Sequence, residues 1–439
     1  MNVFQSYSSS LRTISNPAKL FLLSTISYWV GMTLVQLYLN FYLQGAGLDQ
    51  GWIGLINAAP QLSTVVFTLV IGSVSARLGP WKATIVGTAL AGAGIVGIAL
   101  APGAWTIFAA SILNGLGGGF VWSNAGPFLM EHSRENTRST LFSLQAALGT
   151  LTGFFAFMFG GQLPNFISAV MGVNADANIV LRVVIFGAAA FYLLSLVPVY
   201  FAGRVASDIP VEQLPAVEPS LDEISPRRKR RISISNPGLY FRLILPGSLV
   251  GLGAGMTIPF VNIYIERKFN IDFEGLGQLF AWTSIATAVA LMVQPLLAEK
   301  FGKVKSVVLV QGASLPFLLV LGYSTMFPLV ASALFVRGAL MNMGNPIFSA
   351  YSMERIPARE RATFSSLTSS TWALGWAVGA WFSGAIRDVL GFFEGFNVLF
   401  ALMTALYGAS MVLMWVWFVR EESSQRIAAR VEEKRVQAA

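Results

Sequence analysis

The sequence contains no cysteine, and among its 439 residues there is one histidine, His132. Disulfide bonds, cysteine metal sites and thiol chemistry are therefore excluded, and so are most histidine-based metal sites. Charged residues make up only 11% of the chain, whereas soluble globular proteins carry about 25%. So few charges cannot cover a water-facing surface, which excludes an ordinary soluble protein.

Hydrophobic residues, by contrast, make up 55% of the chain, and the mean hydropathy is +0.64. Apolar runs of roughly 20 residues recur, which is the length of an α-helix that crosses a bilayer. The shorter alternation of about ten residues that is typical of membrane β-barrel strands is absent. The sequence predicts an all-α polytopic membrane protein with twelve spans, at residues 20–43, 52–76, 83–101, 104–130, 139–163, 179–202, 238–265, 275–298, 306–325, 328–353, 362–386 and 395–419.

Segment 203–237 differs in composition from the spans on either side. It contains Pro210, Pro215, Pro219 and Pro226 and several acids, followed by the basic run at 227–231. Such a composition cannot bury a core and is typical of a linker. We expect an N-terminal six-helix bundle at 1–202, a cytoplasmic linker, a C-terminal six-helix bundle at 238–419 and a cytoplasmic tail at 420–439.

The basic residues are distributed unevenly between the two sides of these spans. If the N-terminus is cytoplasmic, 23 of the 29 lysines and arginines lie in inner loops and tails, and four lie in outer loops. This bias predicts a cell-membrane protein with both termini in the cytoplasm. It also accounts for the net charge of +8, because basic residues contact the anionic lipids of the cytoplasmic leaflet. We therefore expect lipid contacts, no nucleic-acid partner, and a monomer.

Two loops 223 positions apart are versions of one sequence. The first is GSVSARLGPWK, at 72–82, and the second is PLLAEKFGKVK, at 295–305. The same offset aligns Met130-Glu131 with Met353-Glu354, and Arg138 with Arg361. A parallel duplication of six helices is the plan of one large class of membrane transporters.

These loops resemble the signature loop of the major facilitator superfamily, which has a glycine, an acid–arginine pair, a second glycine and then basic residues. Gly72, Arg77, Gly79 and Lys82 match that pattern, and Ala76 stands in place of the acid. The resemblance implies two pseudo-symmetric six-helix bundles and transport by alternating access. It also implies that the loop locks an inner gate. The candidate gate residues are Arg77, Lys82, Glu131, Arg138, Glu299, Lys300, Glu354 and Arg361.

No aspartate or glutamate lies in the middle of any predicted span. A buried carboxylate is the usual proton carrier in such proteins, so the sequence gives little support for proton coupling. Arg337, in contrast, falls about 15 Å into the tenth span, and the repeat places Asn114 at the equivalent position. With other polar and aromatic side chains in the spans, these form the candidate substrate site: Arg337, Asn114, Gln36, Asn262, Gln145, Asn345, Trp372 and Trp376.

An aromatic cavity that lacks acids favours a small amphipathic organic solute, and we expect an exporter. Two alternatives remain: uptake of a small organic anion bound through Arg337, and a non-transporting membrane sensor with the same fold. Membrane-embedded enzymes usually need a histidine, an acid or a metal ion beside the membrane. We therefore expect no enzyme activity, no catalytic or metal site and no cofactor.

Overall fold

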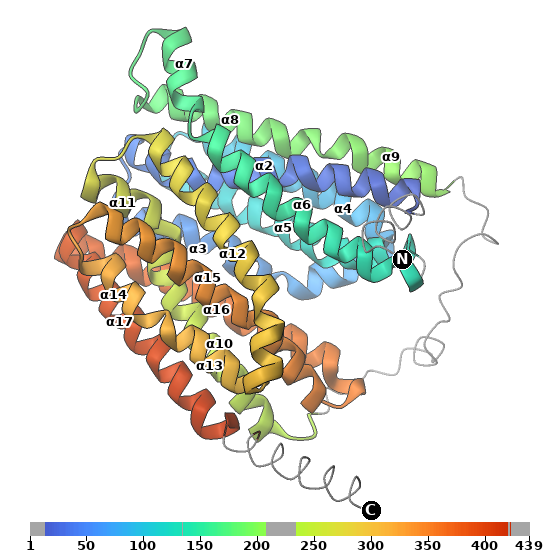
Figure 1. The fold of residues 1–439 in the computed structure, drawn as a ribbon. Helices are drawn as coiled ribbons and strands as arrows, with labels where there is room; N and C mark the ends of the chain where they lie inside the picture. The colour runs from blue at the N-terminus through green and yellow to red at the C-terminus, as the bar shows by residue number, and fades with distance from the viewer. Residues whose placement is uncertain (1–13, 134, 208–233, 420–421, 423–439) are drawn as a thin grey trace, which may run out of the picture. The chain divides into compact units, whose positions relative to one another are not determined.

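The computed structural model describes residues 14–133, 135–207, 234–419 and 422 (Figure 1). Within these ranges the chain is almost entirely helical and contains no strand, which confirms the all-α prediction. Most of the predicted linker, and the C-terminal tail apart from Glu422, lie outside the described residues. The chain forms two compact units: unit 1 is drawn from Met1–Arg230 and Asn262–Ala281, and unit 2 from Arg231–Val261 and Trp282–Ala439.

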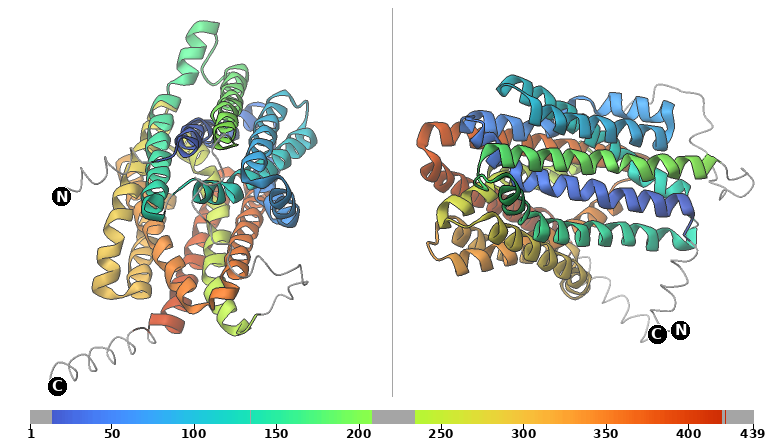
Figure 2. Two further views of the ribbon diagram at one scale, coloured as in Figure 1. Left: turned by 90° about the vertical axis from the view of Figure 1, so that its right-hand side faces the viewer. Right: turned by 90° about the horizontal axis from the view of Figure 1, so that it is seen from above.

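Unit 1 contains the first six spans. Its helices are α2 (Asn16–Gly45), α3 (Gln50–Val66), α4 (Thr68–Leu100), α5 (Ala104–Glu131), α6 (Glu135–Gly160), α7 (Leu163–Met171), α8 (Asn178–Leu194) and α9 (Leu196–Ser207). Helices α8 and α9 run along α2 in both views (Figures 1 and 2). Helix α9 continues past the expected end of the sixth span at residue 202.

Unit 2 is built mainly from the last six spans. Its helices are α10 (Pro237–Thr257), the 3-10 turn η2 (Ile258–Phe260), α12 (Phe273–Phe301), α13 (Lys303–Ala313), α14 (Leu315–Tyr323), α15 (Phe327–Arg355), the 3-10 turn η3 (Ala358–Glu360), α16 (Arg361–Leu390), α17 (Phe392–Met414) and the π-helical turn η4 (Trp415–Val419). The chain joins unit 1 from Asn262 to Ala281, which covers most of α11 (Val261–Phe269) and the first part of α12.

Prolines explain why several predicted spans consist of two helices. A proline has no N–H to donate to the carbonyl four residues earlier, and its ring clashes with that carbonyl. Pro198 accordingly follows the junction between α8 and α9, and Pro316 follows the junction between α13 and α14. Pro259 lies in η2, between α10 and α11. The sequence prediction treated each of these three spans as one helix.

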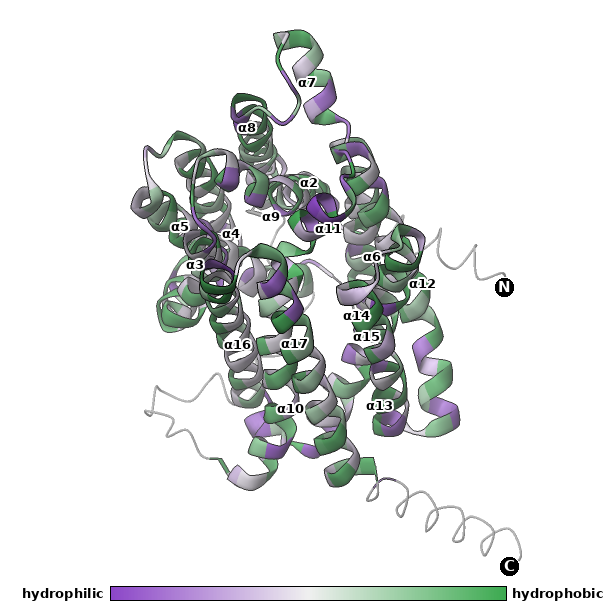
Figure 3. Ribbon diagram, turned by 90° about the vertical axis from the view of Figure 1, so that its left-hand side faces the viewer, coloured by the Kyte–Doolittle hydropathy of each residue, from purple (hydrophilic) through white to green (hydrophobic). Residues whose placement is uncertain are grey.

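Ten helical stretches in the described part of the chain are long and apolar enough to cross a membrane. Two of the twelve predicted spans, the second and the eleventh, are not among these ten stretches. Helix α3 has only 17 residues, and α4 joins the end of the second span to the third span across a kink at Gly79. Helix α16 is long enough, but serines, threonines and glycines lower its mean hydropathy. In Figure 3 hydrophobic residues predominate in most of the long helices, whereas α16 is paler and α11 carries several hydrophilic residues.

The duplicated loops adopt the same backbone conformation. Gly79 has φ 77° and ψ 163°, and Gly302 has φ 106° and ψ 157°. Only glycine enters this region of conformational space without strain. Each loop is therefore a single-glycine turn between two helices, shorter than the sequence suggested, and the internal repeat is present in the structure.

The turn at Gly79 is anchored to the end of the sixth span by Trp81. The indole nitrogen Nε1 of Trp81 donates a hydrogen bond of 2.9 Å to the carbonyl of Val199. The ring lies directly on Gly203, where an added Cβ atom would come within 1.7 Å of it. Gly203 is therefore required by packing and not by its backbone conformation.

Glycines also allow close helix packing within each unit. An added Cβ at Gly117 of α5 would lie 2.3 Å from the backbone nitrogen of Ala91 in α4. In unit 2, an added Cβ at Gly379 of α16 would lie 2.2 Å from the carbonyl oxygen of Leu252 in α10. These backbone contacts bring the helices of each unit close enough to exclude side chains between them.

Candidate functional site

Gln145 is the one member of the predicted substrate set that lines the cavity found within unit 1. The space between its walls, including the part open to solvent, has a volume of about 420 Å³. Helices α2, α4, α5 and α6 and the junction between α8 and α9 contribute its walls. The lining residues are Phe21, Ser24, Thr25, Tyr28, Trp29, Thr84, Val121, Trp122, Ala125, Gln145 and Ser195.

The walls of this cavity are aromatic and carry no charge. Trp29 and Trp122 meet edge to face with ring centroids 5.7 Å apart, so the two indoles form a corner. Besides the Tyr28 phenol, four serine and threonine hydroxyls line the cavity, and each of these four donates its proton to a backbone carbonyl three or four residues earlier. They therefore remain available to a ligand as acceptors. The Gln145 amide makes no hydrogen bond to the described residues and offers both a donor and an acceptor.

Asn114 and Gln36 do not line this cavity. The Asn114 amide nitrogen donates to the carbonyl of Ala91 at 3.1 Å, which ties α5 to α4. Gln36 takes part through its backbone carbonyl, which accepts a 3.3 Å hydrogen bond from Asn262 Nδ2. The structure thus gives both residues contacts that join helices of unit 1.

Asn262 belongs to a chain of three asparagines in unit 1. Asn57 Nδ2 donates to Asn40 Oδ1 at 2.8 Å, and Asn40 Nδ2 donates to Asn262 Oδ1 at 3.1 Å. Asn262 Nδ2 then donates to the carbonyl of Leu37 at 2.9 Å. These bonds connect α3, α2 and α11, and Asn40 and Asn262 are both buried. We call the three residues the amide ladder.

The Arg337 side chain is 7% exposed and is directed at α17 within unit 2. Its guanidinium donates a 3.1 Å hydrogen bond to the Tyr407 hydroxyl and lies 5.8 Å from the centre of the Tyr407 ring. Arg337 forms no ion pair with the described residues, and its buried Nε has no hydrogen-bond partner among them. Asn345, on the same helix, accepts instead from Gln311 at 3.3 Å.

Trp372 and Trp376 lie together on α16, as their spacing indicates. Their ring centroids are 5.0 Å apart with an interplanar angle of 34°. The backbone of each residue is in close contact with a glycine of α10, Gly251 and Gly255 respectively. The two rings therefore form one aromatic wall on the surface of α16 within unit 2.

Three of the predicted gate residues, Lys300, Glu354 and Arg361, have side-chain contacts within unit 2. In unit 2, Lys303 and Glu354 form an ion pair. Arg361 Nε donates to the carbonyls of Met353 and Ile356, at 3.0 Å and 3.3 Å, and so stabilises the end of α15. Lys300 lies over the ring of Phe301. Arg138 is half-buried. The other four predicted gate residues are exposed: Arg77, Lys82, Glu131 and Glu299.

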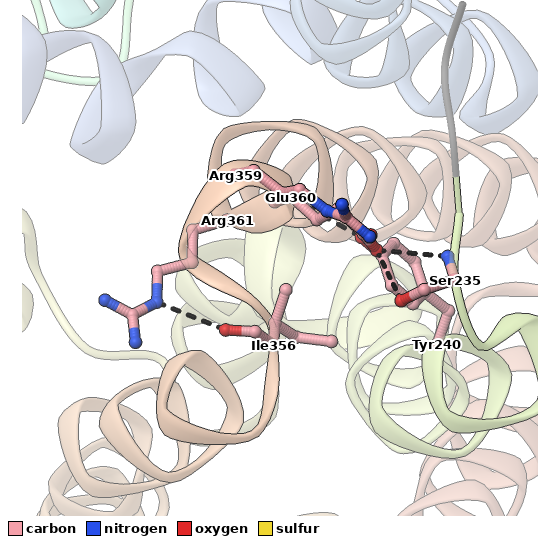
Figure 4. A network of polar contacts seen from close by, with 6 residues as sticks. All are labelled: Ser235, Tyr240, Ile356, Arg359, Glu360 and Arg361. Atoms are coloured by element: carbon pink, nitrogen blue, oxygen red, sulfur yellow. Dashed lines mark hydrogen bonds and ion pairs between the residues drawn. The ribbon is translucent and has the colours of Figure 1, made fainter. Parts of the chain in front are cut away.

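Sequence reasoning missed a buried carboxylate, Glu360, in the turn before α16 (Figure 4). Its side chain is 3% exposed. Oε2 accepts hydrogen bonds from the Ser235 backbone N–H at 3.2 Å, from the Ser235 hydroxyl at 3.1 Å and from the Tyr240 hydroxyl at 3.2 Å. The Ser235 N–H is the largest cause of a Glu360 pKa below the ordinary value, while burial opposes the shift. Arg359 lies 3.5 Å away.

Glu422 was also missed, because the predicted tail gave no structural signal. Its carboxylate accepts hydrogen bonds from the backbone N–H groups of Lys303, Val304 and Lys305, at 2.6, 3.0 and 3.3 Å. These are the unpaired donors at the positive end of α13, where a carboxylate is favourable. Glu422 thus ties the residues after the twelfth span to the second copy of the duplicated loop.

The described residues contain no group of three or more histidine, cysteine, aspartate or glutamate side chains that is suited to hold a metal ion. The polar groups of both units form helix contacts, helix caps and one uncharged cavity.

Comparison with known proteins extends these observations. The sequence profile of the Major Facilitator Superfamily matches residues 20–249 and 243–439. A multidrug efflux protein of Bacillus subtilis, YfmO, is 32% identical over 131 residues, which is 30% of this chain and 31% of that protein. An uncharacterized MFS-type transporter of Escherichia fergusonii, YcaD, is 23% identical over 84% of this chain and 87% of that protein.

Among solved structures, a bacterial homologue of the iron transporter ferroportin in an inward-facing state matches with a TM-score of 0.70. It is 14% identical and covers 91% of this chain and 98% of its own. At that identity the likeness concerns the fold alone. It confirms the twelve-helix plan of two six-helix bundles that the sequence predicts.

Proposed function

The chain belongs to the major facilitator superfamily and is a membrane transporter of that family, and from this premise we propose that it exports a small amphipathic organic solute by alternating access. In such transporters two six-helix bundles rock around a central site, which opens to one side of the membrane at a time. The positions of the lysines and arginines support a cell-membrane location with both termini in the cytoplasm.

The uncharged cavity of unit 1 is the observation that carries this proposal. Its aromatic corner, formed by Trp29 and Trp122, suits the ring of an amphipathic solute, because aromatic pairs prefer edge and offset contacts. Gln145 and the hydroxyl acceptors suit the polar groups of the same molecule. A fully polar solute such as a sugar would leave much of this wall without a matching contact.

Export is supported by the similarity to the B. subtilis multidrug efflux protein, which covers under a third of either chain. In this proposal the duplicated loops, with Arg77 and Lys300, act at the inner gate. Glu131, Glu354 and their neighbours pair and separate there during transport. The Lys303–Glu354 ion pair lies within unit 2 and supports the view that Glu354 can pair with a basic residue of the loop. The solute and membrane lipids are the proposed partners, and the protein works as a monomer.

Uptake of an organic anion is the second candidate, because Arg337 is a buried cation that forms no ion pair with the described residues. Its guanidinium is directed at Tyr407 and does not line the cavity of unit 1. An anion would therefore have to reach the interface between α15 and α17. We place this function second for that reason.

Binding and flux measurements separate the two candidates. Purified protein is screened by thermal shift against neutral and cationic aromatic compounds and against organic anions, and each hit is followed by flux in proteoliposomes with and without a pH gradient. Trp122→Ala should weaken binding of an amphipathic hit by about 2- to 10-fold, which corresponds to roughly 0.5–1.5 kcal/mol of aromatic contact. Flux should not depend on the pH gradient.

Trp105→Ala is the matched control, since Trp105 is an exposed tryptophan of the same helix outside the cavity. It should leave affinity and flux unchanged. If Trp122→Ala and Gln145→Ala both bind as the wild type does, whereas Arg337→Gln abolishes binding of an anion, the export proposal is wrong and the anion candidate replaces it.

A further inference from the structure

The fifth span ends in an apolar segment that is longer than the membrane requires. No charged residue occurs from Ser139 to Ala175. The first 20 residues of the apolar stretch, Leu141 to Gly160, already cover about 30 Å as a helix, which is the thickness of the hydrocarbon core. The next segment, α7, therefore begins where the core ends.

Helix α7 does not extend the axis of α6. A turn at Gly161 and Gln162 separates the two helices, and Pro164 is at the start of α7. Gly172 ends the helix with a left-handed conformation, φ 67°. In Figures 1 and 2, α7 stands away from the main body of unit 1, next to the start of α8. The long apolar segment thus turns sideways at the end of the span.

The two sides of α7 differ in chemistry. Phe166 and Val170 are four residues apart and share one face, and they are 68% and 73% exposed. Asn165 and Ser168 are three residues apart and form the polar face. A short helix with one uncovered apolar face and one polar face is the pattern of a helix that lies in a membrane–water interface.

The neighbouring helices show what covers the apolar face. On α6, Phe155 and Phe159 are exposed, and on α8 Ile179 is exposed. Both helices belong to candidate membrane spans, at Leu141–Met171 and Asn178–Val205, so we expect these side chains to contact lipid. Along the chain, Phe166 and Val170 lie between them, in one apolar band of the sequence. A leaflet that covers the band on both sides of α7 also covers α7.

We infer that α7 is an interfacial helix whose face at Phe166 and Val170 is buried among the acyl chains of the leaflet at this end of the spans. Asn165 and Ser168 then face the headgroups and water. The helix holds the ends of the fifth and sixth spans at a fixed depth in the bilayer. Its partner is a lipid surface, recognised by apolar contact and not by charge, because α7 carries no charged residue.

The absence of cysteine from the sequence makes this inference directly testable. Single-cysteine variants Phe166→Cys and Val170→Cys are labelled with an environment-sensitive fluorophore and reconstituted in phosphatidylcholine vesicles, and Asn165→Cys on the polar face is the matched control. Nitroxide-labelled phospholipid is the quencher from the lipid side, and iodide is the quencher from the water side.

We expect lipid nitroxide to quench positions 166 and 170 at least about twofold more than position 165, and iodide to show the opposite order. Equal accessibility to iodide at all three positions would place α7 in water and overturn the inference. Protection at 166 and 170 that resists lipid quencher and disappears when the protein is diluted in lipid would overturn it in favour of a second copy of the chain. The two apolar-face variants give the same comparison independently if one of them fails to fold.

Discussion

Gly203→Ala should destabilise the protein through one aromatic ring. An alanine Cβ at this position would lie 1.7 Å from Cε2, 1.9 Å from Cδ2 and 2.1 Å from Nε1 of Trp81. Ordinary contact requires about 3.5–4.0 Å, so the indole must move by about 2 Å. That movement breaks the hydrogen bond to the Val199 carbonyl.

The expected cost is the sum of two effects. Overpacking costs about 1–3 kcal/mol, and the broken hydrogen bond leaves a partly buried donor and acceptor unpaired at about 1–3 kcal/mol. We expect a loss of about 2–6 kcal/mol, measured as a lower apparent midpoint of thermal unfolding in detergent. Gly187→Ala is the matched control in the same span, because an added Cβ at Gly187 meets nothing within 4 Å.

A double-mutant cycle identifies the cause. If the clash with Trp81 is responsible, Gly203→Ala should cost much less in a Trp81→Ala background, because the ring that it displaces is already absent. Equal costs in the two backgrounds would refute this reasoning, and so would a Gly203→Ala variant that unfolds at the same temperature as Gly187→Ala.

Three further predictions concern polar contacts. Asn40→Ala removes the middle of the amide ladder and should cost about 1–3 kcal/mol in thermal unfolding; no change would mean that the ladder is not stabilising. Glu422→Ala should cost about 0.3–2 kcal/mol, less in high salt, because it uncovers the N-terminus of α13; a salt-independent effect would contradict this origin. Glu360, with a folded pKa below the ordinary value of 4.5, contributes stability that is present above that value and lost as pH falls through the folded pKa. Unfolding midpoints measured across that pH window should therefore fall less steeply in Glu360→Gln than in the wild type.

The fold was predictable from the sequence because each span satisfies its backbone hydrogen bonds internally, so length and hydropathy identify most of the spans. The duplicated loops were found by sequence identity, and Gly79 and Gly302 share one conformation because the glycines are retained. Helix breaks were less predictable. Pro198, Pro259 and Pro316 were visible, but a proline within a membrane helix produces either a kink or a break, depending on its neighbours.

Contacts between site residues were predictable only where the residues are close together in the sequence. The Trp372–Trp376 wall follows from a four-residue separation on one helix, and Gln145 lies in a cavity as expected of a polar residue within a span. For Arg337 the depth in the span is predictable from the sequence, but the direction of its side chain is not, because the rotation of α15 about its axis depends on packing against other helices. The partner of Asn262 is 222 positions away, and nothing in either residue's surroundings indicates the pairing.

The two copies of the duplicated loop are held at equivalent positions by different chemistry. Residues 81 and 304 are separated by the repeat offset of 223, and so are 199 and 422. In unit 1 the Trp81 indole donates to the carbonyl of Val199 at 2.9 Å. In unit 2 the backbone N–H of Val304 donates to the carboxylate of Glu422 at 3.0 Å.

Because the residue types differ, alignment of the two halves cannot reveal the shared contact, although its position is the same. In both units, therefore, the loop is fastened to the end of the last span of its own half, and in the proposed mechanism a gate residue on the loop would move with that unit. A rocking mechanism requires this coupling, since a loop free to move alone would open the gate without moving the helices.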